Sequence, residues 1–189
     1  MSFNPEIHHR RSIRLQHYDY SKAGFYFITL CVQNKELLFG EIIDDQMTLN
    51  TAGQMIEKEW LALEKRFFHV ELHEYIVMPN HFHAVIEVGN APMVTPQKGR
   101  PQGYAPTSQF TNKAIGEIIG AFKSITTIEY IRGIKIHDWQ GFDGKLWQRN
   151  YWEHVIRHEQ SRNEIAQYII NNPKQWAIDK LKPSEETAT

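Results

Sequence analysis

The stretch that decides the fold reads EYIVMPNHFHAVIEV and runs from Glu74 to Val88. A Met78-Pro79-Asn80 turn interrupts its apolar run, and two histidines one residue apart follow. If the chain continues as a strand, His81 and His83 lie on one face roughly 6 to 7 Å apart, a spacing that one metal ion can bridge. The alternate positions are all apolar and predict a buried opposite face, formed by Phe82, Ala84, Ile86 and Val88.

The segments on either side predict an α+β fold. A strand over 70–78 pairs with the histidine strand through the turn, and β-branched and aromatic runs over 24–33 and within 144–158 predict two more strands. Apolar residues at helical spacing predict helices over 50–67, 110–132 and 159–172, and Asp44-Asp45 predicts a hairpin. Together these elements predict one antiparallel sheet of about four strands with helices mainly on one face.

Length and composition predict a single domain over 1–189. The chain has 189 residues and is 41% hydrophobic, enough for one sizeable core. Within it we expect a basic N-terminal arm over 1–22, a mobile loop rich in proline and glycine over 89–109, and a polar tail over 177–189. No segment resembles a signal peptide or a membrane span, so we expect a cytoplasmic protein without a membrane partner.

The net charge and the single cysteine indicate how a nucleic acid could be bound and what role the thiol has. The net charge is −1, so a nucleic-acid partner would be held by local basic patches rather than by bulk attraction. The single cysteine, Cys31, lies in a strand-like apolar run and is expected to be a buried structural thiol.

The histidine pair leaves two kinds of metal site open, besides plain half-exposed histidines on a sheet face. His69 or His73 from the preceding strand would complete a catalytic zinc site with three histidines. A side-chain oxygen delivered from a helix would instead suit Mg²⁺ or Mn²⁺. The spacing of the residues does not choose between them.

Four segments carry a resemblance to a known family. They are YIVMPNHFHAVIEV, LWQRNYWEHVIR, AQYIINNPKQW and, near the start, RRSIRLQHYDYSKAGFYFITLCVQNKELLFGEI. Together they resemble the REP-associated tyrosine transposases of the HUH superfamily. The resemblance covers most of the chain and implies a ferredoxin-like domain. It also implies that His81 and His83 bind a divalent ion, Mg²⁺ or Mn²⁺, and that Tyr168 is the nucleophile. Asn172 falls on the third ligand, where related insertion-sequence enzymes are expected to carry glutamine.

These residue types suit phosphodiester chemistry. A cation stabilises the negative charge that builds on the phosphate oxygens, and a tyrosine oxygen is both a competent nucleophile and a reasonable leaving group. On a helix Tyr168 and Asn172, four residues apart, lie on one face. Plausible phosphate contacts are Arg10, Arg11, Arg14, Lys123 and Arg149. Aromatic residues beside Arg149 are typical of single-strand binders, although core packing is the favoured explanation for Trp147 and Trp152.

The predicted function is therefore metal-dependent cleavage and rejoining of single-stranded DNA next to a hairpin, through a 5′-phosphotyrosine at Tyr168. The hairpin preference follows from the resemblance. When bound to DNA the protein would be associated with the nucleoid. Two alternatives remain: a domesticated, non-catalytic protein that binds hairpin nucleic acid, and a zinc-dependent hydrolase that uses His73. The sequence leaves open whether the chain acts as a monomer or as a homodimer.

Overall fold

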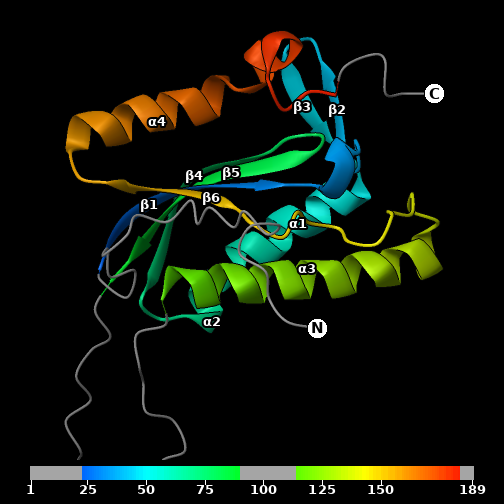
Figure 1. Cartoon of the computed structure of the whole chain (residues 1–189), viewed down its shortest axis with the longest axis horizontal. Coiled ribbons are helices and arrows are strands. Elements are labelled where there is room, and N and C mark those ends of the chain that lie inside the picture. Colours follow the sequence, from blue (N-terminus) through cyan, green and yellow to red (C-terminus); the bar gives the residue numbers. More distant parts are fainter. Residues whose placement is uncertain (1–22, 90–113, 184–189) are drawn as a thin grey trace, which may run out of the picture.

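The computed structural model describes residues 23–89 and 114–183 (Figure 1). The expected basic arm, almost all of the expected loop and the last residues of the tail lie outside these ranges. The strands are β1 (Gly24–Cys31), β2 (Gly40–Ile43), β3 (Gln46–Leu49), β4 (Val70–Val77), β5 (His81–Val88) and β6 (Trp152–Ile156). The α-helices are α1 (Thr51–Leu61), α2 (Leu63–Arg66), α3 (Ile115–His137) and α4 (Glu159–Asn171), and η1 (Gln33–Lys35) and η2 (Pro173–Ile178) are short 3₁₀ helices.

The main sheet has four antiparallel strands in the order β4-β5-β1-β6, as predicted. Along the chain, its strands and the two longer helices beneath it follow the order β1-α1-β4-β5-α3-β6. This is the β-α-β-β-α-β pattern of the ferredoxin-like fold. The predicted α+β fold class is therefore confirmed. The helices α1 and α3 cover one face of the sheet, whereas α4 lies across the other (Figure 1).

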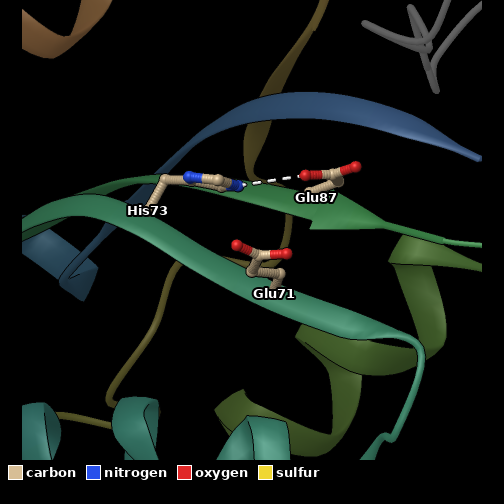
Figure 2. Close-up of side chains that lie close together, drawn as sticks. All are labelled: Glu71, His73 and Glu87. Atoms are coloured by element: carbon tan, nitrogen blue, oxygen red, sulfur yellow. Dashed lines mark hydrogen bonds and ion pairs between the residues drawn. The ribbon is translucent and has the colours of Figure 1, made fainter.

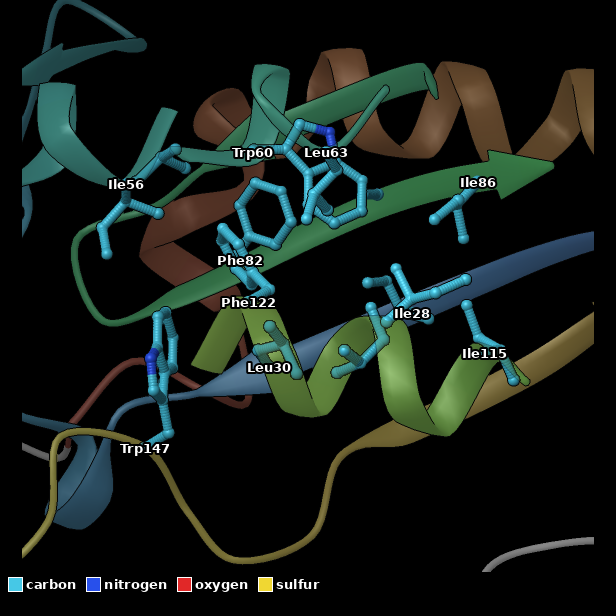
Figure 3. Close-up of a cluster of buried hydrophobic side chains, with 14 of the residues drawn as sticks. Ile28, Leu30, Ile56, Trp60, Leu63, Phe82, Ile86, Ile115, Phe122 and Trp147 are labelled. Carbon is cyan, nitrogen blue, oxygen red and sulfur yellow. The ribbon is translucent and has the colours of Figure 1, made fainter. Parts of the chain in front are cut away.

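Side-chain alternation on β5 divides the residues between two layers. The even-numbered residues from Phe82 to Val88 belong to the main hydrophobic core between the sheet and the helices α1 and α3. At the centre of this core Trp60, Phe82 and Phe122 meet edge to face or tilted, with ring centroids 4.8 to 5.6 Å apart (Figure 3). Val85 belongs instead to a smaller cluster on the α4 face. The predicted apolar face is confirmed.

Local chemistry sets the ends of the surrounding elements. Asn50 caps α1, because its side-chain oxygen accepts a hydrogen bond from the Gly53 amide at 2.9 Å. Asp44 and Asp45 have φ values of 49° and 59°, the left-handed conformation that two-residue hairpin turns require, and they join β2 to β3. Pro173 cannot continue the hydrogen-bond pattern of α4, so the chain passes into η2.

Strand β4 contains a bulge that the sequence pattern does not reveal. Leu72 pairs with Ile86 and Tyr75 pairs with Ala84, so two residues of β4 lie opposite the single residue Val85. Leu72 and Tyr75 both pack against the main core although they are three residues apart, which strict alternation forbids. The extra residue resolves this conflict and displaces His73 and Glu74 from the regular ladder.

None of the helices in the described residues is both long enough and apolar enough to span a membrane.

Candidate functional site

The two histidines of β5 lie side by side beneath α4 and η2. Their ring centroids are 4.6 Å apart, and His81 and His83 are 0% and 2% exposed. The Trp176 ring of η2 lies 6.0 Å from the His81 ring and helps to cover it. The alternative of half-exposed histidines on an open sheet face is therefore wrong, because α4 and η2 close over this face.

A hydrogen-bond chain through Asn80 determines which nitrogen of His81 carries a proton. The Asn80 amide nitrogen donates to the carbonyl oxygens of Lys35 and Leu181 at 3.1 and 2.8 Å. Its Oδ1 must then be the acceptor in the 2.8 Å contact with Nδ1 of His81. The proton of neutral His81 therefore lies on Nδ1, and the lone pair of Nε2 is available to a ligand.

His83 lies between a threonine and the expected nucleophile. Its Nδ1 is 2.8 Å from Oγ1 of Thr29, the residue directly opposite it on β1, and its Nε2 is 3.3 Å from the hydroxyl of Tyr168. The Phe27 ring stacks on the imidazole at 5.4 Å. These contacts fix the ring and point Nε2 toward α4.

Helix α4 brings Tyr168 and Asn172 to the histidines. Tyr168 is 39% exposed at the edge of the buried site, whereas Asn172, at the end of the helix, is 1% exposed. The polar side chain of Asn172 lies close to both His81 and Tyr168. It therefore raises the pKa of His81 and lowers the pKa of Tyr168. The predicted residues thus meet at one place, although Tyr168 and His83 are 85 positions apart.

Burial keeps the two imidazoles and the Tyr168 phenol neutral at pH 7. It lowers the pKa of His81 to about 4, against the opposing effects of the Asp179 charge and Asn172. Burial and the neighbouring His81 lower the pKa of His83 well below its ordinary value. Burial, followed by the Asp179 charge, raises the pKa of Tyr168. Both imidazoles are therefore in the unprotonated form that binds metals, and Tyr168 is a neutral phenol.

Two buried polar atoms in the site have no hydrogen-bond partner. They are Nε2 of His81 and Oδ1 of Asn172, both of them lone-pair acceptors. Leaving such atoms unpaired costs roughly 1 to 3 kcal/mol each, so they fit a site built around a cation. Asp179, which the sequence analysis missed, adds a carboxylate 3.9 Å from Nε2 of His81. No periodic pattern marks it, because it follows the irregular turns of η2.

An open cleft of about 810 Å³ lies next to the Tyr168 hydroxyl. Its aromatic lining includes Phe27, Tyr151, Trp152 and His154, and the rings of Trp152 and His154 stack at 5.9 Å with an angle of 8° between them. Core packing was one explanation for Trp147 and Trp152. It holds for Trp147, which is 4% exposed, and is wrong for Trp152, which is 43% exposed.

Cys31 also lines this cleft. It is half-buried rather than fully buried as expected, because its side chain points to the α4 face of β1 instead of into the main core. Burial raises the pKa of its thiol, so the group is protonated at pH 7.

The expected phosphate contacts are only partly described. Arg149 is exposed close to the cleft residues Gln148 and Asn150. Nζ of Lys123 donates to the backbone carbonyls of Gln148 and Arg149 at 2.6 and 3.1 Å, so it braces the segment that carries Arg149. The arginines of the basic arm, Arg10, Arg11 and Arg14, lie outside the described residues.

The histidines of the preceding strand do not complete the pair. The backbone of His69 bonds to Gly89, at the end of the β4–β5 ladder far from His81. His73 lies instead with two glutamates, Glu71 and Glu87 (Figure 2). Within the described residues, this is the sole group of three or more histidine, cysteine, aspartate or glutamate side chains whose ligand atoms come together.

Comparison with known proteins finds a relative over almost the whole chain and a solved structure with the same fold. No protein-family model matches it. An uncharacterized protein of Haemophilus influenzae is 41% identical over 191 residues, which cover 95% of this chain and 96% of that protein. Among solved structures, the REP-associated tyrosine transposase bound to a REP hairpin matches with a TM-score of 0.53 and 18% identity, over 86% of this chain and 73% of that one. The chain therefore belongs to the family of the Haemophilus influenzae protein and has the fold of the REP-associated tyrosine transposase, as the sequence motifs predicted.

Proposed function

We propose that this protein is a metal-dependent nuclease and strand transferase that cuts and rejoins single-stranded DNA next to a hairpin. Tyr168 would be the nucleophile and a 5′-phosphotyrosine the intermediate. The observation that carries the proposal is the meeting of the Tyr168 hydroxyl with Nε2 of His83, at 3.3 Å, on the edge of an open aromatic cleft. A tyrosine and a buried histidine pair in this arrangement suit phosphoryl transfer better than a structural role.

The buried acceptors fit a divalent ion. His81, His83 and Asn172 would hold it, with two nitrogen ligands and one oxygen ligand, and Asp179 would contribute negative charge nearby. Mixed imidazole and oxygen ligands are compatible with Mn²⁺, and Mg²⁺ is the expected alternative. Such an ion supplies a Lewis acid that polarises the scissile phosphate.

The covalent step follows from the placement of Tyr168. Its Oη forms a bond to the scissile phosphorus, and the bond from phosphorus to the upstream O3′ breaks. The phenol proton passes to solvent in the cleft; His83 would hold the ion and would therefore not serve as the base. The upstream oxygen takes up a proton and becomes a free 3′ hydroxyl. Attack by a 3′ hydroxyl on the phosphotyrosine reverses these changes and rejoins the strand.

The cleft supports a single-stranded substrate. Exposed aromatic rings such as Trp152 can stack with unpaired bases, and the nearby Arg149 can contact a phosphate. The preference for a hairpin rests on the solved transposase of the same fold, which is bound to a REP hairpin. A protein that acts in this way would work in the cytoplasm, on the nucleoid.

The decisive experiment incubates the full chain with end-labelled single-stranded oligonucleotides that contain a hairpin and unpaired flanks, with Mn²⁺, Mg²⁺ or a chelator. We expect cleavage in the flank, only with a metal, and a protein–DNA adduct on the 5′ end of the downstream fragment. A library of flanking sequences removes the dependence on one recognition sequence. Hairpin binding without cleavage of any library member would favour the alternative of a non-catalytic binder.

A further inference from the structure

A second group of metal-ligating side chains lies on the sheet away from the histidine pair. Glu71 and His73 of β4 and Glu87 of β5 each offer a ligand atom, and these atoms all lie within 4.8 Å of one another (Figure 2). Nε2 of His73 is 3.2 Å from Oε2 of Glu87. Nothing in the proposed DNA chemistry uses these three residues.

The strand pairing places two carboxylates of this group face to face, an arrangement that a cation would stabilise. Glu71 and Glu87 lie directly opposite each other on neighbouring antiparallel strands. Like charges in this position destabilise a sheet, whereas opposite charges stabilise it. The two carboxylates together carry two negative charges, and a divalent ion would neutralise both.

The bulge in β4 adds a nitrogen ligand at this point. His73 belongs to the two residues that lie opposite Val85, between the ladder pairs Leu72–Ile86 and Tyr75–Ala84. The Phe25 ring contacts its imidazole at 5.2 Å and supports it from β1. One imidazole nitrogen and two carboxylates on a partly exposed surface leave room for water to complete a coordination shell.

We propose that Glu71, His73 and Glu87 form a second metal site, which binds a divalent transition-metal ion such as Zn²⁺. One imidazole with two carboxylates is a ligand set that suits Zn²⁺ well. The site joins β5 to β4, which is an edge strand of the main sheet, where the bulge interrupts their ladder. A bound ion therefore acts as a clamp between the two strands. This inference is independent of the proposed function.

Zinc titration by calorimetry tests the site in a protein that lacks the two histidines of the proposed catalytic site. The full chain, with any affinity tag removed, carries His81→Ala and His83→Ala, so that the proposed catalytic site cannot contribute. We expect this protein to bind one Zn²⁺ and the addition of His73→Gln to weaken that binding at least tenfold. Glu87→Gln and Glu71→Gln should each weaken it as well. The matched control is His137→Gln, at an exposed position on the last turn of α3, which should change nothing.

Two further measurements separate binding at this site from other effects. Histidine ring signals in NMR spectra should show that Zn²⁺ shifts the resonances of His73 first. At about a hundredfold excess over Kd, Zn²⁺ should raise Tm by about 5 to 10 °C, and His73→Gln should abolish the rise. Circular dichroism establishes that each variant is folded. Unchanged zinc binding in His73→Gln, or no zinc binding by the His81→Ala/His83→Ala protein, would overturn the inference.

Discussion

The hydroxyl of Tyr168 lies 3.3 Å from Nε2 of His83 because α4 crosses the face of the sheet that carries the β5 histidines. The contact joins the most exposed reactive group of the site to one of its most buried nitrogens. A nucleophile that can reach both the cleft and the buried pair needs this position at the boundary.

Replacing Tyr168, the proposed nucleophile, should remove the covalent intermediate and little else. Tyr168→Phe deletes one oxygen from a partly exposed ring, so the fold and metal binding should persist while the adduct disappears. The matched control is Tyr151→Phe, which removes a hydroxyl from another tyrosine of the same cleft. Mass spectrometry of the trapped species locates the modified residue. A DNA-linked peptide that contains Tyr151 instead would show that the nucleophile is misplaced.

Removing either buried histidine should separate cleavage from binding. We expect His81→Ala or His83→Ala to abolish cleavage and metal binding at the histidine pair, and to leave hairpin binding within a few-fold of the original. The reason is that phosphate contacts elsewhere should supply most of the affinity. Cleavage assays and gel-shift titrations at fixed salt measure the two quantities. Full cleavage by either variant contradicts the assignment of these residues as metal ligands.

Asn80 should act through His81 rather than on the substrate. Asn80→Ala removes the acceptor that holds the His81 proton on Nδ1, so metal affinity should fall by about 10- to 100-fold. Excess Mn²⁺ should then restore much of the cleavage rate, because the ligands themselves are intact. Calorimetry with Mn²⁺ and cleavage rates across a Mn²⁺ series measure both effects. A rate that does not respond to added Mn²⁺ would point to structural damage instead.

Trp152 should contribute to the binding of unpaired bases. Trp152→Ala should weaken binding of hairpins with single-stranded flanks by about 1 to 3 kcal/mol, whereas Trp152→Phe should retain most of the affinity. An abasic flank should abolish the difference between the original protein and Trp152→Ala. The control is Phe68→Ala, which removes another exposed aromatic ring, one that is not part of the cleft lining. Equal losses for both variants would contradict a base-stacking role.

The metal-free protein should lose stability on acidification through pH 6.5. His81 has a pKa of about 4 in the folded state and about 6.5 when unfolded, so the unfolded chain takes up the proton first as the pH falls. The contribution is complete above pH 6.5 and is lost between pH 6.5 and 4, by an amount of the order of 3 kcal/mol. Urea unfolding in the presence of a chelator measures this loss. His81→Asn should flatten the profile, and an unchanged slope would refute the explanation.

The sequence predicted what depends on local periodicity. The alternation from His81 to Val88 correctly separated the core face from the histidine face, and the Asn50 cap and the Asp44-Asp45 turn have recognisable local chemistry. Sequence patterns failed where the position of a residue in the packed structure decides whether its side chain is buried. Trp152 is exposed because β6 is an edge strand that borders the cleft.

Two contributors to the site left no usable pattern. Asp179 reaches His81 from an irregular segment, and the role of Asn80 depends on carbonyl groups of Lys35 and Leu181 that lie 45 and 101 positions away. Contacts between such distant segments follow from the packed structure and not from spacing along the chain.

The division of β5 between two buried faces restricts how this chain can change in length. Deleting a single residue such as Phe82 would shift every later side chain to the opposite face. His83 and Val85 would then enter the main core, and Ala84 and Ile86 would face α4. Insertions and deletions within His81–Val88 should therefore cost both folding and chemistry at once. In relatives that retain the activity, we expect gaps in an alignment to fall outside this strand.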